Sequence, residues 1–274
     1  MTETGESGET VVTEEKRASG TWDPGQYARF GDHRLRPALE LFARIDHDAP
    51  KLAVDLGCGG GEIARLMTER WPDAAVIGMD SSPEMLAKAG KVPSSVQWQQ
   101  ADITQWQPPR PADVLFSNAM LHWVAGHGTI FPRLFEMLAP GGVLAVQMPL
   151  SWPEPSHQAL REVLKELDLG TPELHASVDR RWVQPTGFYY GLLQPLASVI
   201  DIWETRYLQV LHGENPVLEW VKGSALRPVL DVLTPDEQAR FLDEYGARLR
   251  KLYPPQEGGE TLFPFPRLFI VAKA

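Results

Sequence analysis

A glycine-rich turn near residue 57 constrains the fold of this chain more than any other feature. Residues 54–61 read Val-Asp-Leu-Gly-Cys-Gly-Gly-Gly, with an apolar stretch before them and a helical pattern from Glu62 onward. Glycine lets the backbone bend sharply and lets a ligand approach the bare main chain. The helix that follows offers free N–H groups to polar or anionic atoms. We therefore expect a strand, a tight turn and a helix, with a nucleotide-like ligand at the turn.

The spacing of the glycines argues against a dinucleotide. Gly57 and Gly59 supply two positions of the G-x-G-x-x-G fingerprint, but the third position falls on Glu62. A carboxylate at that position repels a pyrophosphate, which disfavours NAD and FAD. The P-loop pattern G-x-x-x-x-G-K-[ST] is absent from the chain. An adenosine cofactor without phosphates and with cationic groups fits better, and S-adenosylmethionine is such a molecule.

Polar residues at the ends of the later strand-like segments support an adenosine site. Asp80 follows an apolar segment, at the position where an acid accepts the ribose hydroxyls of NAD and adenosyl cofactors alike. Asp102 and Asn118 end the next two strand-like segments. Ligands of open α/β sheets bind at the carboxyl edge of the strands. The sequence therefore predicts that these residues and Asp55 lie along one sheet edge.

Two residues inside the glycine run have structural interpretations. Asp55 either orders the turn through hydrogen bonds or meets a cationic group of the cofactor, and we favour the first role. Cys58 is the only cysteine, and no Cys/His spacing typical of a metal site accompanies it. We expect Cys58 to fill the turn, and we predict no metal.

Composition excludes several classes of partner. The chain has 274 residues, 43% of them hydrophobic, and a formal net charge of −10. Its acidity argues against nucleic-acid binding, which needs a basic surface. No apolar run approaches the roughly 20 residues of a membrane span, and the single cysteine suggests a reducing compartment such as the cytoplasm. Residues 1–20 are rich in Gly, Ser, Thr and Glu and are expected to form a disordered acidic tail.

Strands and helices alternate through the first half of the chain, which predicts a parallel sheet with right-handed crossovers. Apolar residues at helical spacing predict a helix over 34–45. The segments that follow are strand 52–56, helix 62–71, strand 75–80, helix 83–90, strands 96–100 and 112–118, helix 129–138 and strand 143–148. We expect Pro140-Gly141-Gly142 to separate the last of these helices from its strand.

The second half is less regular. It contains a helix near 156–168, a strand over 199–210, a helix over 215–230 and a final strand over 263–272. Thr234, Pro235 and Glu237 form the start signal of one further helix, because they supply an N-cap, a first-turn proline and the acid of a capping box.

Together these segments resemble a class I S-adenosylmethionine-dependent methyltransferase, and more narrowly the bacterial trans-aconitate 2-methyltransferase family. The narrower resemblance lies in Trp22-Asp23-Pro24 with residues 34–41, in residues 117–123, in residues 146–149 with Trp152, and in Trp220-Val221, Leu226-Arg227-Pro228 and residues 264–272. It implies a Rossmann-like doubly wound α/β sheet of seven strands, with the last strand antiparallel. The methyltransferase domain would span 21–274, with helical substrate-cap elements at about 150–195 and 213–255.

The resemblance also implies an activity and a set of site residues. The activity is methylation of one carboxylate of trans-aconitate to a monomethyl ester, with S-adenosylhomocysteine as the other product. Expected cofactor-binding residues are Tyr27, Asp55, Gly57, Gly59, Gly61, Asp80, Ser81, Met85, Asp102, Ile103, Asn118 and Trp123. Expected substrate-binding residues are His33, Arg36, His122, Trp152, Tyr190, Arg227 and Arg267.

A carboxylate acceptor needs little catalytic machinery. Its pKa is near 4, so it is already ionised at neutral pH, and no residue has to act as a base. Placing one oxygen in line with the methyl carbon can supply ~7–11 kcal/mol through proximity and orientation. Arginine suits the remaining carboxylates because it pairs with them through two hydrogen bonds.

Alternatives remain open from the sequence. A phenol, amine or natural-product acceptor would need a base, for which His33 or His122 are candidates. A non-catalytic, cofactor-binding regulatory protein is a second alternative, and a nicotinamide oxidoreductase, disfavoured by Glu62, is a third. We expect a small anionic substrate and no nucleic-acid or membrane partner, and the chain could be a monomer or a homodimer.

Overall fold

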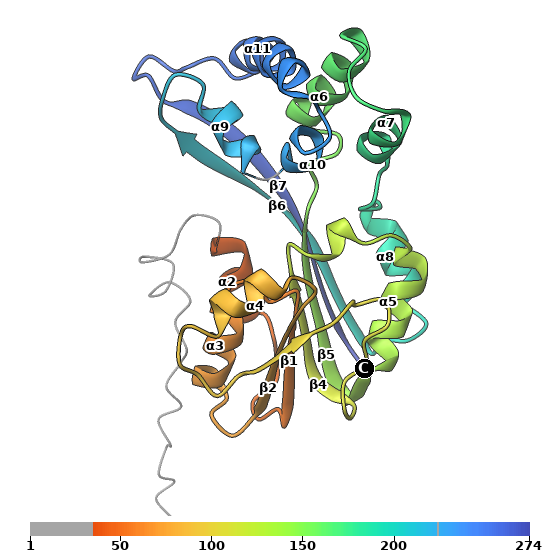
Figure 1. Ribbon diagram of the computed structural model, residues 1–274. Helices are drawn as coiled ribbons and strands as arrows, with labels where there is room; N and C mark the ends of the chain where they lie inside the picture. Colours follow the sequence, from red (N-terminus) through yellow and green to blue (C-terminus); the bar gives the residue numbers. More distant parts are fainter. Residues whose placement is uncertain (1–34, 224) are drawn as a thin grey trace, which may run out of the picture.

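A seven-stranded sheet forms the centre of the computed structural model, which describes residues 35–223 and 225–274 (Figure 1). The strand order is β3-β2-β1-β4-β5-β7-β6. The strands are β1 (Leu52–Leu56), β2 (Ala75–Asp80), β3 (Gln97–Gln100), β4 (Ala112–Asn118), β5 (Leu138–Pro149), β6 (Val199–Leu211) and β7 (Thr261–Lys273). Only β7 is antiparallel to its neighbours. The predicted Rossmann-like sheet with an antiparallel last strand is confirmed.

Helices cover both faces of this sheet. On one face, α2 (Arg36–Ala43) and α3 (Glu62–Arg70) pack against alternate strand residues such as Ala53 and Phe116. On the other face, α5 (His127–Glu136) and α8 (Thr186–Leu193) pack against the intervening residues. The short helix α4 (Pro83–Ala89) lies beside β2 and β3 (Figure 1). The strand order reverses between β1 and β4, and ligands of such sheets bind at this switch point.

A separate helical lobe lies above the end of β5, at the top of Figure 1. It consists of α6 (Pro155–Glu166), α7 (Pro172–Asp179), α9 (Pro216–Lys222), α10 (Arg227–Leu230) and α11 (Pro235–Leu252). The lobe has its own hydrophobic core, in which Phe241 and Tyr245 of α11 are fully buried. Helix α11 begins with the predicted capping box, because Thr234 and Glu237 bond each other's backbone N–H groups.

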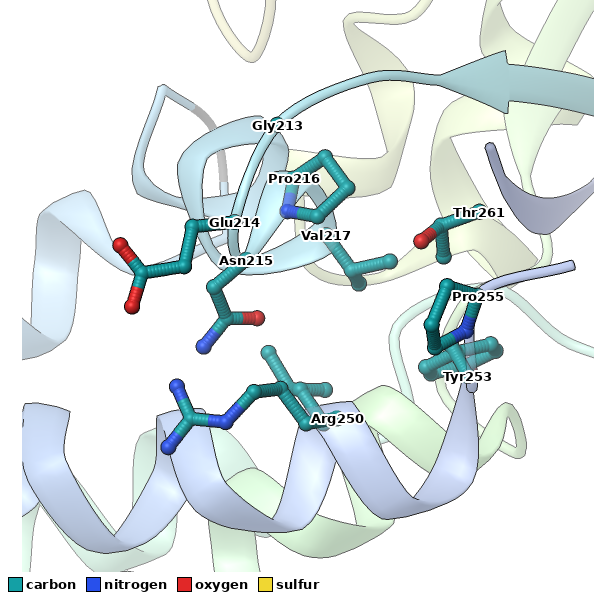
Figure 2. Close-up of a pocket in the computed structure, with 10 residues that line it drawn as sticks. Gly213, Glu214, Asn215, Pro216, Val217, Arg250, Tyr253, Pro255 and Thr261 are labelled. Atoms are coloured by element: carbon teal, nitrogen blue, oxygen red, sulfur yellow. The ribbon is translucent and has the colours of Figure 1, made fainter. Parts of the chain in front are cut away.

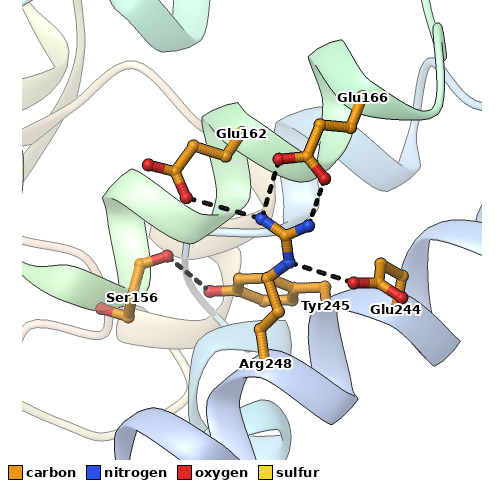
Figure 3. A network of polar contacts seen from close by, with 6 residues as sticks. All are labelled: Ser156, Glu162, Glu166, Glu244, Tyr245 and Arg248. Carbon is orange, nitrogen blue, oxygen red and sulfur yellow. Dashed lines mark hydrogen bonds and ion pairs between the residues drawn. The ribbon is translucent and has the colours of Figure 1, made fainter.

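A polar network joins α11 to α6 (Figure 3). The guanidinium of Arg248 contacts three carboxylates, those of Glu162, Glu166 and Glu244. One turn earlier on α11, the hydroxyl of Tyr245 donates a 3.0 Å hydrogen bond to the carbonyl of Ser156 at the start of α6. This second bond is buried, so it holds the first turn of α6 in a fixed position.

Several boundaries differ from the sequence-based expectation. Strand β5 begins at Leu138, so Pro140-Gly141-Gly142 lies inside the strand, where Gly141 has a φ of 77° and the pairing with β4 shifts register. The helix expected over 215–230 is two helices, α9 and α10, separated by a break after Lys222. Helices α7 and α8 were not predicted, although Thr171 and Pro172 form a readable start signal for α7.

Parts of the predicted organisation fall outside the described residues. These are the tail at 1–20, the segment containing Tyr27 and His33, and Arg34, the first residue expected in helix 34–45. Within the described part of that helix, α2 spans Arg36–Ala43.

Candidate functional site

The glycine turn connects β1 to α3 and is fastened to β2. The N–H groups of Gly57 and Cys58 donate to the carbonyl oxygen of Met79, at 2.8 and 2.9 Å. Gly61 has a φ of 78°, and a Cβ there would lie 2.3 Å from the Trp98 side chain, so only glycine fits. At Gly59, with a φ of 52°, a Cβ would meet nothing within 4 Å. The space above Gly59 is therefore open to a ligand.

Asp80 joins the glycine turn to the start of α4. Its Oδ2 accepts a 2.8 Å hydrogen bond from the N–H of Gly59, and its Oδ1 accepts one of 2.9 Å from the N–H of Ser82. Each carboxylate oxygen has a second acceptor site, so Asp80 can also accept ligand hydroxyls. Ser81 and Met85 lie exposed next to it.

Asp55 is buried under the turn. Burial raises the pKa of Asp55 to about 7, and the charges of Asp80 and Glu62 add to the rise. A hydrogen bond from the backbone N–H of Ala64 opposes this shift. Since Ala64 lies in the first turn of α3, this contact agrees with the loop-ordering role.

Asp102 follows β3 on the same side of the sheet. Its Oδ1 accepts hydrogen bonds from the N–H and the hydroxyl of Thr104, at 2.8 and 2.9 Å. These bonds lower the pKa of Asp102. Its Oδ2 has no partner among the described residues and is exposed to solvent with the rest of the side chain, while the neighbouring Ile103 is buried.

A buried polar cluster of Asn118, His122, Gln147 and Arg267 lies at the carboxyl ends of β4 and β5 and beside the middle of β7. Asn118 pairs with Gln147 in the sheet register, and Arg267 lies opposite Pro149. Arg267 is only 7% exposed, and its guanidinium donates a 3.4 Å hydrogen bond to the side-chain oxygen of Gln147. The Arg267 guanidinium also lies 4.0 Å from the centre of the Phe265 ring.

Arg267 lacks a carboxylate partner within the part of the chain that the structure describes. Burial lowers the pKa of Arg267 to about 10, with the nearby Tyr207 opposing the shift, so the guanidinium stays charged at neutral pH. Buried charges are normally paired, because removing an ion from water is costly. An unpaired buried guanidinium therefore suits an anionic ligand.

The buried polar cluster contains several atoms without partners. Asn118 Oδ1, His122 Nδ1, Gln147 Nε2 and Arg267 Nε are all buried and lack hydrogen-bond partners among the described residues. Buried polar atoms in proteins nearly always have a partner. Two of these atoms, on Gln147 and Arg267, are N–H donors, so the cluster fits a ligand that brings acceptor oxygens.

Two further features of the buried polar cluster are a strained backbone at Ala119 and a lowered pKa of His122. Ala119, directly after Asn118, has a φ of 51°, a strained conformation that is often found at functional sites. Burial lowers the pKa of His122 to about 3, assisted by the positive charge of Arg267. His122 is therefore neutral at physiological pH. Trp123 is 56% exposed, and its ring lies tilted against that of His122, with 4.7 Å between the ring centres.

The other predicted substrate residues that the structure describes make no hydrogen bond to this cluster. Arg36 forms a 2.7 Å ion pair with Glu40, and its guanidinium lies 5.1 Å from the ring centre of Tyr207. Arg227 is exposed at the first position of α10, and Tyr190 is exposed on α8. Trp152 follows the end of β5 and lies under the guanidinium of Arg161. Of the predicted substrate residues that the structure describes, only His122 and Arg267 belong to the buried polar cluster, beside the predicted cofactor residue Asn118.

Sequence reasoning missed Gln147. The signal was present, because Gln147 is the only polar residue in the run Val143-Leu144-Ala145-Val146-Gln147-Met148. A fully buried amide in an apolar strand needs a hydrogen-bonding reason, and here its oxygen contacts Arg267.

The described residues also contain a pocket that is separate from the strand edge formed by the glycine turn, Asp80, Asp102 and the buried polar cluster. A pocket of about 130 Å³ in the lobe, shown in Figure 2, is formed by residues of 213–217 and 249–261 and shares none with the edge. In the described ranges no group of three or more His, Cys, Asp and Glu side chains could hold a metal ion. None of the described helices is both long enough and apolar enough to cross a membrane.

Comparisons with known proteins agree with this geometry. A family model described as a methyltransferase domain matches residues 53–142. Proteins named trans-aconitate 2-methyltransferase from Azoarcus sp. (strain BH72) and Pseudomonas aeruginosa are each 44% identical to the chain. The alignments cover 92% of this chain in both cases, and 98% and 93% of the relatives.

Solved structures share the fold at low sequence identity. A putative methyltransferase from Bacillus halodurans superimposes with a TM-score of 0.54 at 15% identity, covering 85% of this chain and 96% of that chain. The YcgJ protein of Bacillus subtilis gives a TM-score of 0.57 at 14% identity, covering 88% of this chain and 97% of that one.

A sheet of this order, with a glycine turn after β1 and an antiparallel β7, is the fold of the class I methyltransferases, and the chain is an enzyme of this S-adenosylmethionine-dependent class. Its sequence identity to the curated relatives extends over nearly their whole length. The chain therefore belongs to the trans-aconitate 2-methyltransferase family.

Proposed function

We propose that this enzyme transfers a methyl group from S-adenosylmethionine to one carboxylate of trans-aconitate, giving a monomethyl ester and S-adenosylhomocysteine. The observation that supports this acceptor best is the buried, unpaired guanidinium of Arg267 beside Asn118. The names of the relatives point to the same small tricarboxylic anion.

The residues at the strand edge fit the cofactor. Asp80 would accept the ribose hydroxyls, since both of its oxygens keep acceptor capacity beside the open space at Gly59. Asp102 and Ile103 would hold the adenine, through a free carboxylate oxygen and an apolar surface. The glycine turn would face the methionine end. When bound, the cofactor supplies an electrophilic methyl group on a sulfonium.

The chain's own contribution is to bind and orient the acceptor. Arg267 and Gln147 would donate hydrogen bonds to a carboxylate through their unpartnered N–H groups. The acceptor enters as an anion and leaves as an ester without gaining or losing a proton, so no residue has to act as a base. Rate acceleration then comes from placement, which can supply ~7–11 kcal/mol.

His122 favours a carboxylate over a phenol as the acceptor. A phenol must lose a proton during methylation, and an efficient general base has a pKa near the working pH. The pKa of His122 is lowered to about 3 by burial, which makes it a poor base at neutral pH. We assign His122 a binding role instead, and we assign the helical lobe, with Trp152 and Arg227, the role of a substrate cap.

A methyl-transfer screen tests this function. The purified chain is incubated with S-adenosylmethionine and a panel of polycarboxylic acids, monocarboxylic acids and phenols, and products are identified by mass spectrometry. We expect the monomethyl ester of trans-aconitate and no methylated phenol. Methylation of a phenol in preference to trans-aconitate would overturn the proposal.

A further inference from the structure

A second cationic site lies on α6, outside the strand-edge cluster. His157 and Arg161 are four residues apart and therefore lie on the same side of this helix. The Arg161 side chain is only 13% exposed, and its guanidinium lies 4.5 Å from the centre of the Trp152 ring. The indole N–H of Trp152 donates a 3.2 Å hydrogen bond to the carbonyl of Asp179, which fixes the ring under the arginine.

The charge of Arg161 is only partly balanced. Its nearest carboxylate is that of Asp179, 3.9 Å from its Nε. The same carboxylate lies 2.9 Å from the ammonium of Lys165, so its charge is shared. The two terminal nitrogens of Arg161 make no hydrogen bond to the described residues. A largely buried guanidinium whose two terminal NH2 groups are free suits a carboxylate, which can accept one hydrogen bond from each.

Arg161 adjoins the strand edge through the short segment that joins β5 to α6. The Trp152 ring under its guanidinium lies three residues after Pro149, the last residue of β5, which pairs with Arg267 in the sheet register. The N–H of Leu150 donates a 3.0 Å hydrogen bond to the carbonyl of Pro266, the residue before Arg267. The Arg161 site and the buried polar cluster therefore both adjoin the carboxyl end of β5.

Hydrogen bonds with two tyrosines, Tyr245 in α11 and Tyr253 at its C-terminal end, fix the first turn of α6. The N–H of Ser156 donates a 3.1 Å hydrogen bond to the hydroxyl of Tyr253. The carbonyl of Ser156 accepts one of 3.0 Å from the hydroxyl of Tyr245 (Figure 3). Ser156 is the residue before His157, so these two bonds fix the direction in which His157 and Arg161 project.

We propose that Arg161, with Trp152 beneath it and His157 beside it, binds a carboxylate of the acceptor other than the one that is methylated. This inference rests on the proposed function and adds a specificity determinant to it. A substrate that spans Arg267 and Arg161 must have at least two carboxylates, so the enzyme selects polycarboxylates over monocarboxylates.

Substitution of Arg161 tests this subsite in the full chain. Arg161→Met keeps the apolar stem on Trp152 and removes the charge. Calorimetric titration of trans-aconitate into the S-adenosylhomocysteine complex should show a Kd raised ~10–100-fold, since a charge-assisted hydrogen bond is worth about 1.5–3 kcal/mol. The KM should rise more than kcat falls, and the Kd for S-adenosylhomocysteine should stay unchanged. Lys251→Met, which removes an exposed cation of α11 that has no ion pair among the described residues, is the control and should behave like wild type.

Three results would contradict the subsite. The first is an unchanged Kd for trans-aconitate in Arg161→Met. The second is an equal loss in Lys251→Met, which would indicate a general charge effect. The third is loss of S-adenosylhomocysteine binding in both Arg161→Met and Arg161→Lys, which would indicate a structural role. If the wild-type chain binds S-adenosylhomocysteine but methylates no tricarboxylate, the proposed function fails as well, and so the two failures are distinguishable.

Discussion

The guanidinium of Arg267 donates a 3.4 Å hydrogen bond to the side-chain oxygen of Gln147, and both side chains are buried where β5 pairs with β7. The bond fixes the amide so that its oxygen faces the arginine. Gln147 Nε2 and Arg267 Nε then remain as buried donors without partners among the described residues. In the proposed function this pair offers one full charge and two unpartnered N–H donors to a carboxylate of the acceptor.

Replacing Gln147 by Glu should disable this arrangement. A carboxylate at position 147 would form an ion pair with Arg267. The guanidinium would then no longer be free to bind a carboxylate of the substrate. We expect the KM for trans-aconitate to rise ~10–100-fold, the size of a lost charge-assisted contact. Steady-state kinetics measures this. Gln147→Leu, which introduces no competing charge, should raise KM less, and equal effects of the two variants would contradict the explanation.

Asp80 should control cofactor affinity. Asp80→Ala removes the acceptor of the Gly59 and Ser82 N–H groups and both oxygens offered to the ribose. Calorimetry should detect no binding of S-adenosylhomocysteine to this variant. Asp73→Ala is the control, because Asp73 is an exposed acid that precedes the first residue of β2, whereas Asp80 is the last. This variant should bind S-adenosylhomocysteine normally. Undiminished binding by Asp80→Ala would refute the cofactor assignment.

Asp55 should make the ligand-free enzyme less stable as the pH rises. Its pKa is raised to about 7 by burial, whereas an unfolded Asp titrates near 3.9. Between about pH 4 and pH 7 the unfolded chain has lost this proton and the native chain keeps it, so the free energy of unfolding falls as the pH increases. Asp55→Asn should remove about 3 kcal/mol of the loss between pH 5 and pH 8, since the native pKa lies about two pH units above pH 5. Urea unfolding of both proteins at pH 5 and pH 8 measures how much the free energy of unfolding falls. An equal fall in Asp55→Asn and in the wild type would contradict this role of Asp55.

The Tyr245 hydroxyl should stabilise the lobe. Tyr245→Phe keeps the ring in the core and removes only the hydrogen bond to Ser156. We expect the free energy of unfolding to fall by about 1 kcal/mol, the usual net value of a neutral hydrogen bond. Because Ser156 precedes His157, the KM for trans-aconitate should also rise, while the affinity for S-adenosylhomocysteine stays constant. A stabilised variant would contradict this role.

The positions of Asp80 and Asp102 at one sheet edge could be predicted because the signals are local in sequence. Each acid ends or follows its own strand, so the order of the segments alone gives its place. The buried polar cluster could be predicted only in part. The role of Gln147 depends on Arg267, which is 120 residues away in sequence and reaches it only when β7 inserts antiparallel beside β5.

The sequence alone also does not show which arginines are buried in the fold. Family resemblance named Arg36 and Arg227, yet Arg36 pairs with Glu40 one turn away and Arg227 is exposed on α10. Arg161 was not singled out, because a helical arginine at a half-buried position looks like any other surface cation in sequence. Its burial over Trp152 arises from the packing of α6 against α7, which no local pattern encodes.

The most direct test compares the wild-type chain with Arg267→Met in methyl transfer to trans-aconitate, with the ester measured by mass spectrometry at saturating S-adenosylmethionine. We predict that the wild type forms the monomethyl ester. Arg267→Met should bind S-adenosylhomocysteine normally but lose about 100-fold in kcat/KM, because a buried charged contact is worth about 3 kcal/mol. Equal kcat/KM values for the two proteins would show that the buried guanidinium does not bind the acceptor.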